Sequence, residues 1–297
     1  MKFMKNLFGD SPKNSANHFA DLDLPLELEK AIDELGFIDC TPVQKEVLPQ
    51  SIDGLDIIAQ AQTGTGKTAA FLISMLTYHI ENPELSVRGS GTPFALIIAP
   101  TRELVIQIAD EAKKLSAYTD IIITPIVGGI DYEKQKQLMQ SHVDIVVATP
   151  GRLLDFCRSN IINLSRVESL VIDEADRMLS MGFIPDVKSI IRRTPNKDRR
   201  QTQLFSATLS EDIQRLAKAW TLNPFQVHIK PEQIAVGSVA QLVYLTAECE
   251  KFRVLFNLLK SVEVTKAIIF VNRRDQTRSL EENLHRYKIS TGLLTGE

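Results

Sequence analysis

The sequence has little cysteine, little aromatic content and no excess of positive charge. Its three cysteines, Cys40, Cys157 and Cys249, are odd in number and widely spaced, which argues against a disulfide framework and indicates reduced thiols in a cytoplasmic protein. They have no metal-ligand spacing, and the five histidines are equally dispersed. The formal net charge is −3 at pH 7, so any nucleic-acid binding must use a local face of the protein.

Long apolar runs are also absent from the sequence. Residues 1–8 are followed by Gly9-Asp10-Ser11-Pro12 before the apolar core of a signal peptide develops. No run reaches the roughly 18 apolar residues that a transmembrane helix needs. Apolar residues make up 44% of the chain and charged residues 24%, which is typical of globular proteins. The sequence therefore predicts a soluble protein, and its length suggests roughly two domains.

The most informative stretch is residues 56–68. An apolar run predicts a buried strand, a loop with Gly64 and Gly66 follows, and Lys67-Thr68 open an apolar helical pattern. This is the order of a phosphate-binding loop, in which backbone N–H groups and a helix N-terminus face phosphate oxygens. Ala61 stands where the usual pattern has its first glycine. By itself the match is partial, and a turn with a surface lysine is the alternative.

Strand-like apolar runs alternate with helical patterns in the rest of the first 228 residues. Fully apolar strands separated by helices predict a doubly wound α/β fold with a parallel sheet covered on both faces. A polar cluster directly follows each run, so these clusters should converge at the carboxyl edge of the sheet. The runs after the phosphate loop are residues 95–99, 121–126, 144–148, 170–172 and 203–205.

The pattern loosens between Pro224 and Gly237, which predicts a domain boundary. Strands are then expected at residues 242–245 and 266–271, helices at 250–259 and 276–287, and the start of a third strand at 290–294. The predicted organisation is a flexible tail (1–17), a nucleotide-binding domain (18–228), a linker (229–240) and a partial second domain (241–297).

Two shorter patterns need separate interpretations. Thr41, Pro42 and Gln44 have the spacing of a helical capping box, which would make Gln44 a structural residue. Asp173-Glu174 follow an apolar strand, where the aspartate can hold a Mg²⁺ ion shared with Thr68 and the glutamate can orient or deprotonate a water. By itself this segment is typical of a charged helix start. The phosphate loop upstream favours a nucleotide hydrolase.

In their order along the chain, these segments resemble the DEAD-box ATP-dependent RNA helicases. The resemblance covers residues 19–297, and Ala61 is the usual family residue at its position. It implies a RecA-like P-loop NTPase fold, with two domains that close on ATP and RNA. The general texture is similar to bacterial members associated with RNA turnover, which implies RNA-decay or ribosome-related protein partners. The matching segments are Phe19, 36–44, 61–68, 100–104, 128–129, 149–152, 173–176, 206–208 and 268–272.

The resemblance assigns roles by position. Glu174 and Lys67 would be catalytic, Thr68 and Asp173 would bind Mg²⁺, and a second group would couple ATP to domain closure: Asp176, Ser206 and Thr208. The residues implied in ATP binding are Phe19, Gln44, Ala61, Gln62, Thr63, Gly64, Thr65, Gly66, Lys67 and Thr68. Those implied in holding the RNA backbone are Thr101, Arg102, Gly129, Thr149, Gly151 and Arg152.

Alternatives remain for several of these residues. Thr101 and Thr149 have the placement of helix caps, and Thr208 forms a capping-box pattern with Glu211. The basic run Arg192, Arg193, Lys197, Arg199 and Arg200 has the composition of a solvated loop.

The C-terminal segment lacks a feature that the resemblance leads us to expect. A second RecA-like domain normally supplies an arginine finger, and the nearest similar sequence, His285-Arg286-Tyr287, lacks the Gly-Arg that should follow. We therefore expect a truncated helicase that binds ATP through residues 19–208 and shows little RNA-stimulated hydrolysis by itself. Two other functions stay open: an ATP-gated RNA clamp or scaffold without turnover, and a DNA-directed helicase.

Overall fold

The computed structural model describes residues 16–86, 88–229, 242–261 and 264–294. Contacts divide the chain into two compact units, Met1–Glu232 and Gln233–Glu297. Most of the expected N-terminal tail and linker lies outside the described residues. No helix in the described part of the chain is long and apolar enough to cross a membrane.

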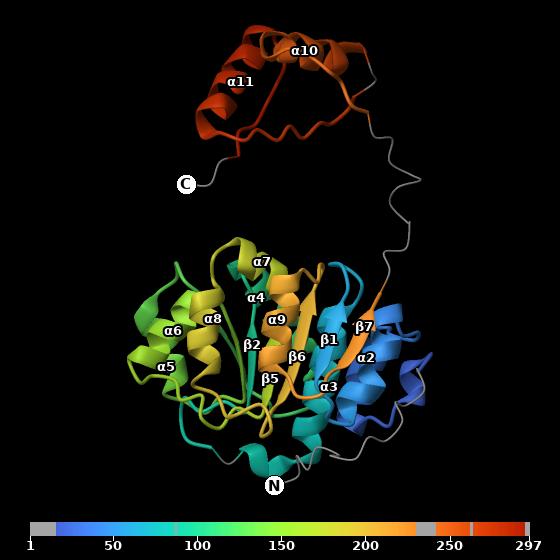
Figure 1. The fold of residues 1–297 in the computed structure, drawn as a ribbon, viewed down its shortest axis with the longest axis vertical. Coiled ribbons are helices and arrows are strands. Elements are labelled where there is room, and N and C mark those ends of the chain that lie inside the picture. Colours follow the sequence, from blue (N-terminus) through green and yellow to red (C-terminus); the bar gives the residue numbers. More distant parts are fainter. Residues whose placement is uncertain (1–15, 87, 230–241, 262–263, 295–297) are drawn as a thin grey trace. The chain divides into compact units, whose positions relative to one another are not determined.

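Seven described strands of the first unit form one parallel sheet (Figure 1). The order is β3-β4-β2-β5-β6-β1-β7, which confirms the predicted doubly wound α/β fold. Because all neighbouring pairs are parallel, the carboxyl ends of the strands share one edge. The strands are β1 Ile57–Gln60, β2 Ala95–Ile98, β3 Ile123–Ile126, β4 Ile145–Ala148, β5 Ser169–Ile172, β6 Gln201–Ser206 and β7 Phe225–His228.

Helices cover the sheet on both faces (Figure 1). Along β2, Ala95 and Ile97 pack into one core cluster, whereas Leu96 and Ile98 pack into the other. The first cluster includes residues of α1 (Leu26–Glu34), α2 (Pro42–Ile52), α3 (Lys67–Glu81) and α4 (Arg102–Leu115). The second includes residues of α5 (Tyr132–Met139), α6 (Pro150–Arg158), α7 (Ala175–Ser180), α8 (Ile184–Ile191) and α9 (Glu211–Trp220). Burial on both faces explains why these strands are uniformly apolar.

Several helices begin where the sequence supplies a cap. Thr41 caps α2 and completes the predicted capping box, since the Gln44 N–H donates to Thr41 Oγ1 (3.4 Å) and the Thr41 N–H donates to Gln44 Oε1 (2.8 Å). Asp131 caps α5 and Ser210 caps α9 with side-chain oxygens that accept backbone N–H groups, without a reciprocal box. Short 3-10 helices lie at Phe19–Asp21 and Pro83–Ser86. These caps anchor the loops that lead into the helices.

The sequence did not predict β7. This strand pairs only with β1, so that it forms an edge of the sheet, and Val227 is its one fully buried side chain. An edge strand with a largely exposed pattern lacks the continuous apolar signal that identified the inner strands.

The second unit contains two longer helices, α10 (Lys251–Ser261) and α11 (Arg274–Arg286), and the short helix η3 (Glu248–Glu250). Both longer helices were predicted. The strands expected at 242–245, 266–271 and 290–294 are absent from the described residues, so those predictions were wrong. A parallel strand needs a neighbour for its backbone hydrogen bonds, and an apolar run does not supply one. The assignment of this unit as part of a second RecA-like domain stays a prediction.

Candidate nucleotide and RNA site

The strand order divides the carboxyl edge of the sheet into two halves. Segments 61–68, 173–176 and 206–208 follow the neighbouring strands β1, β5 and β6. Segments 100–104, 128–129 and 149–152 follow β2, β3 and β4 on the other side. Because β2 and β5 are paired, the two halves meet at the centre of the sheet. The expected nucleotide and RNA residues are thus adjacent groups on one edge.

The phosphate loop depends on glycine for both conformation and space. Gly64 and Gly66 have φ angles of +81° and +90°, in the region that strongly favours glycine. A Cβ at Gly66 would lie 2.6 Å from Gln44 Nε2. Gly66 is the N-cap of α3, so the positive end of this helix faces the loop. Thr65 Oγ1 donates to Gln62 O (2.7 Å) and closes the turn.

Lys67 and Asp173 form a buried pair of opposite charges. Their side chains are 5% and 3% exposed, and Lys67 Nζ lies 3.6 Å from Asp173 Oδ1. Among the described residues, Lys67 Nζ has no hydrogen-bond partner. Burial raises the pKa of Asp173, and the nearby Lys67 ammonium opposes that rise. An ammonium and a carboxylate with unused coordination at a glycine loop fit a phosphate group with its Mg²⁺, to which Thr68 could add a hydroxyl ligand.

Glu174 lies beside this pair in an unusual backbone conformation. Its φ is +51° and its ψ is 51°, which is uncommon for a residue with a side chain and often marks a functional site. Arg177 Nη1 lies 3.3 Å from Glu174 Oε2. The carboxylate is therefore held at the first turn of α7, next to Asp173.

The sequence analysis missed the residues that complete this cleft. A cavity of about 530 Å³ extends from the phosphate loop along α4 and is also lined by Arg177, Gln107 and Glu111. Burial raises the pKa of Glu111. Arg177 could have been identified from its spacing of three residues after Glu174, which places both on one face of a helix. Gln107 and Glu111 carry no comparable signal because their role depends on how α4 packs.

The segment 206–208 is joined to Asp176 by hydrogen bonds. The Thr208 N–H and Oγ1 both donate to Asp176 Oδ2, at 2.9 and 3.0 Å, and the Asp176 N–H donates to Ser206 Oγ (3.2 Å). Burial works to raise the pKa of Asp176, but the hydrogen bonds from Thr208 and Ser206 outweigh it, so the pKa lies below its usual value. The capping box expected for Thr208 and Glu211 was wrong, because Ser210 caps α9.

Gln44 and Phe19 lie on segments that precede the sheet. Gln44 Nε2 donates to Gly66 O (3.1 Å), so one side chain joins the capping box to the phosphate loop. The Phe19 ring is buried and packs on Phe37, with 5.9 Å between ring centroids. Contacts of either residue with adenine stay predictions, as does the family role of Ala61, which is buried after β1.

On the RNA half of the edge, Thr101 and Thr149 differ. The Leu104 N–H donates to Thr101 Oγ1 (3.3 Å), so the capping interpretation holds for Thr101. Thr149 precedes α6 but makes no side-chain capping bond. A Cβ at Gly129, which has φ +74°, would lie 2.4 Å from Arg102 Nη1. The absence of a side chain at Gly129 therefore allows the Arg102 guanidinium to lie directly against the backbone of this residue.

Arg152 is held on the RNA half by one backbone carbonyl and two aromatic rings. Its guanidinium donates to Ile130 O (3.4 Å) and lies 5.3 Å from the centroid of the Tyr132 ring and 5.8 Å from that of Phe156. A Cβ at Gly151 would meet nothing within 4 Å, so the backbone at the start of α6 is open. Open backbone beside an aromatic-supported arginine suits a phosphodiester backbone.

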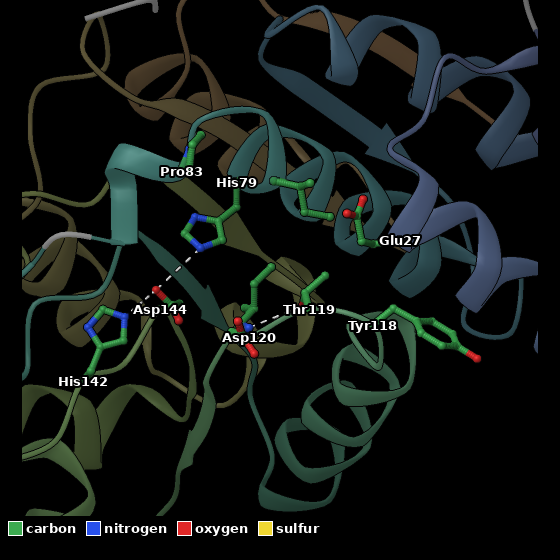
Figure 2. A pocket seen from close by; sticks show the side chains of 10 residues that line it. Glu27, His79, Pro83, Tyr118, Thr119, Asp120, His142 and Asp144 are labelled. Atoms are coloured by element: carbon green, nitrogen blue, oxygen red, sulfur yellow. Dashed lines mark hydrogen bonds and ion pairs between the residues drawn. The ribbon is translucent and has the colours of Figure 1, made fainter.

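A different cavity, of about 560 Å³, lies at the amino edge of the sheet (Figure 2). Asp144 lies between two histidine rings there: Asp144 Oδ1 is 2.8 Å from His142 Nε2 and 3.6 Å from His79 Nε2. The Ile122 N–H donates to Asp144 Oδ2 (2.8 Å). Within the described residues no three His, Cys, Asp or Glu side chains lie together so that they could hold a metal ion, here or elsewhere. Asp144 thus joins the starts of β3 and β4 to the end of α3.

Comparisons with known proteins agree with this geometry. Residues 41–216 match the family model described as DEAD/DEAH box helicase. The chain is 50% identical to an "ATP-dependent RNA helicase RhlB" of Pseudomonas putida and 49% identical to that of Pseudomonas aeruginosa, over 287 residues in each case. These alignments cover 96% of this chain and 72% of each relative. A relative of the same name from Xanthomonas oryzae is 39% identical, and the alignment covers 94% of this chain and 49% of the relative.

The fold also matches a solved structure. A DEAD box protein from the hyperthermophile Methanococcus jannaschii superposes with a TM-score of 0.65 at 33% sequence identity. The match covers 95% of this chain and 74% of the other.

Proposed function

Because the chain belongs to the DEAD/DEAH box helicase family, we propose that it is an ATP-dependent RNA helicase that separates or remodels short RNA duplexes. The observation that carries this proposal is the pairing of β2 with β5, which places Thr101 of the RNA half beside Asp173 of the nucleotide half. ATP and RNA would then bind on one edge and influence each other over a short distance.

Residues of the nucleotide half divide the work on ATP. Lys67 neutralises charge on the β- and γ-phosphates, and the loop 61–68 presents backbone N–H groups to them. Asp173 and Thr68 would hold Mg²⁺, which supplies further neutralisation of the phosphates when it is bound. Glu174 orients the attacking water and accepts its proton, and Arg177 holds the Glu174 carboxylate in place. Gln44 and Phe19 contact the adenine.

The RNA half holds the RNA backbone without reading its bases. Arg102 and Arg152 contact phosphates, Thr101 and Thr149 present hydroxyls, and Gly151 presents open backbone. Gly129 contributes by leaving room for the Arg102 guanidinium. Within the nucleotide half, the hydrogen bonds from Thr208 to Asp176 connect segment 173–176 to segment 206–208. A change at the phosphates would therefore reach β6 directly and favour the state that clamps RNA. Its free cysteines suit the cytoplasm, where we propose that the protein acts. We also propose partners from RNA decay or the ribosome.

The test begins with ATP binding. Lys67→Ala should weaken ATP affinity by roughly 10–100-fold, because it removes a charge-assisted contact worth about 1.5–3 kcal/mol. Lys113→Ala, an exposed lysine of α4, is the control and should bind as the parent does. In a complete enzyme with a full second domain, Glu174→Gln should bind ATP normally and slow phosphate release by about 10²–10⁴-fold, the usual contribution of a general base. Unchanged ATP titrations for Lys67→Ala would contradict the site.

Phosphate release then separates the candidate activities. Stimulation by RNA and not by DNA supports an RNA helicase, whereas equal stimulation by DNA supports a DNA-directed enzyme. ATP-dependent retention of RNA without any phosphate release would indicate a clamp.

A further inference from the structure

A basic cup lies at the amino end of β6. We use this name for a cavity of about 890 Å³ formed by α8, α9 and the loop 192–200. Since β6 runs from Gln201 to Ser206, the basic cup and the 206–208 segment lie at opposite ends of one strand, roughly 20 Å apart. Its charged lining residues are Lys188, Arg192, Lys197, Asp198, Arg200 and Arg215.

The charge of the basic cup is opposite to that of the chain. Five cationic side chains and one carboxylate line it, whereas the formal net charge of the whole sequence is −3. A local positive field on an acidic protein attracts polyanions to that face. The sequence analysis interpreted the basic run as a solvated loop. Three of its five members, Arg192, Lys197 and Arg200, line this concave surface.

Helix capping accounts for two of the five cations. Lys197 Nζ donates to Thr221 O (2.9 Å) and Lys218 O (3.3 Å). Arg200, which is 3% exposed, donates to Trp220 O (3.3 Å), Thr202 Oγ1 (3.2 Å) and Pro195 O. These bonds satisfy carbonyls at the end of α9 and hold the loop 192–200 in one conformation.

The remaining cations are exposed on this rigid frame. Lys188 and Arg192 are four residues apart along α8 and its C-terminal cap, so they lie on one face. Both side chains are exposed, and no ion pair to a carboxylate occurs for either within the described residues. Arg215 lines the basic cup from α9. Its Nη1 lies 3.7 Å from Asp212 Oδ1, and both side chains are exposed. Such surface pairs are weak and exchange readily for another anion.

We propose that the basic cup binds the phosphate backbone of RNA that extends beyond the carboxyl-edge site. The proposal rests on the proposed function, which supplies RNA as the polyanion. Lysine and arginine side chains bind phosphates without reading sequence, and a rigid loop reduces the entropy lost on binding. A protein partner fits less well, since interface cores are rich in accessible aromatic groups, whereas the aromatic residue that lines the basic cup, Trp220, is buried.

The test compares two lengths of fluorescein-labelled oligo(U) by anisotropy. An RNA of about 10 nucleotides approximates one single-strand site, and one of about 40 reaches further. The double variant K188Q/R192Q should weaken the affinity for the long RNA roughly tenfold. It should also reduce the slope of log K against log[salt] by about 1.4, which is about 0.7 for each of two phosphate contacts. The short RNA should bind as it does to the parent. K113Q/K114Q removes the same charge from α4 and should change neither.

Three results would overturn the proposal: unchanged affinity of K188Q/R192Q for long RNA, an equal loss for short RNA, or an equal loss in K113Q/K114Q. The first of these results, unchanged affinity for long RNA, would favour an acidic protein surface as the partner of the basic cup. The variant Arg152→Gln tests the proposed function separately. If it leaves short-RNA binding unchanged while K188Q/R192Q weakens long RNA, the carboxyl-edge site is wrong and the basic cup stands.

Discussion

Two four-residue segments of nearly the same composition differ completely between the two units. Ala95–Ile98, with the sequence ALII, is a fully buried strand of the first unit. Residues 267–270, with the sequence AIIF, have no strand structure in the second unit, where Ile268 is 84% and Phe270 is 92% exposed. Composition alone does not make a strand.

The difference lies in the neighbours. β2 pairs with β4 on one side and β5 on the other, and helices cover both of its faces. The described part of the second unit provides two longer helices but no paired strand. The Phe252, Phe256 and Tyr287 rings pack on one another there, with centroids 4.8–6.3 Å apart, but the Tyr287 side chain is 54% exposed. Exposed apolar runs of this kind are typical of a surface that another structure covers.

The strongest test of this comparison is amide hydrogen exchange. Amides of Ala95–Ile98 should exchange only on global unfolding, whereas those of residues 267–270 should exchange almost as a free chain does. The expected ratio of protection factors is on the order of 10⁴ or more, because core strands open with nearly the full unfolding free energy. Comparable protection of both segments would show that residues 267–270 are paired in solution.

A matched pair of substitutions sharpens the comparison. Ile97→Ala should destabilise the first unit by about 2–5 kcal/mol, because it leaves a cavity between covered strands. Ile268→Ala should change the unfolding free energy by less than about 0.5 kcal/mol, as is usual for exposed positions. Urea titrations followed by circular dichroism measure both. Equal losses would mean that Ile268 is buried.

The smallest expected effect is a dependence on pH that is specific to the first unit. Burial lowers the pKa of His79; Asp144 and Glu168 oppose this, while Arg88 and His142 add to it. Below about pH 6.5 the unfolded chain therefore binds a proton that the folded chain does not, so stability falls as pH falls. The slope is at most about 1.4 kcal/mol per pH unit.

The variant His79→Gln isolates this effect. Urea unfolding of the first unit at pH 7.5 and pH 5.5 should show a smaller loss of stability in the variant than in the parent. An equal loss in both would assign the acid sensitivity to other groups. Asp173 is not one of them, because its raised pKa stabilises the folded state as the pH falls.

The sequence by itself determined the parallel sheet, the phosphate loop and the edge on which the site lies. Continuous apolar runs, glycines before Lys67-Thr68 and polar clusters after strands are local signals, and each depends only on neighbouring residues. Tertiary structure decided three other features: the pairing of β2 with β5, the hydrogen bonds from Thr208 to Asp176, and the meeting of Arg177 and Glu111 in one cleft. Tertiary structure also decided that residues 267–270 form no strand. The hydrogen bonds between strands and the helices that cover a strand come from residues far away in the chain. A local sequence pattern does not identify those residues.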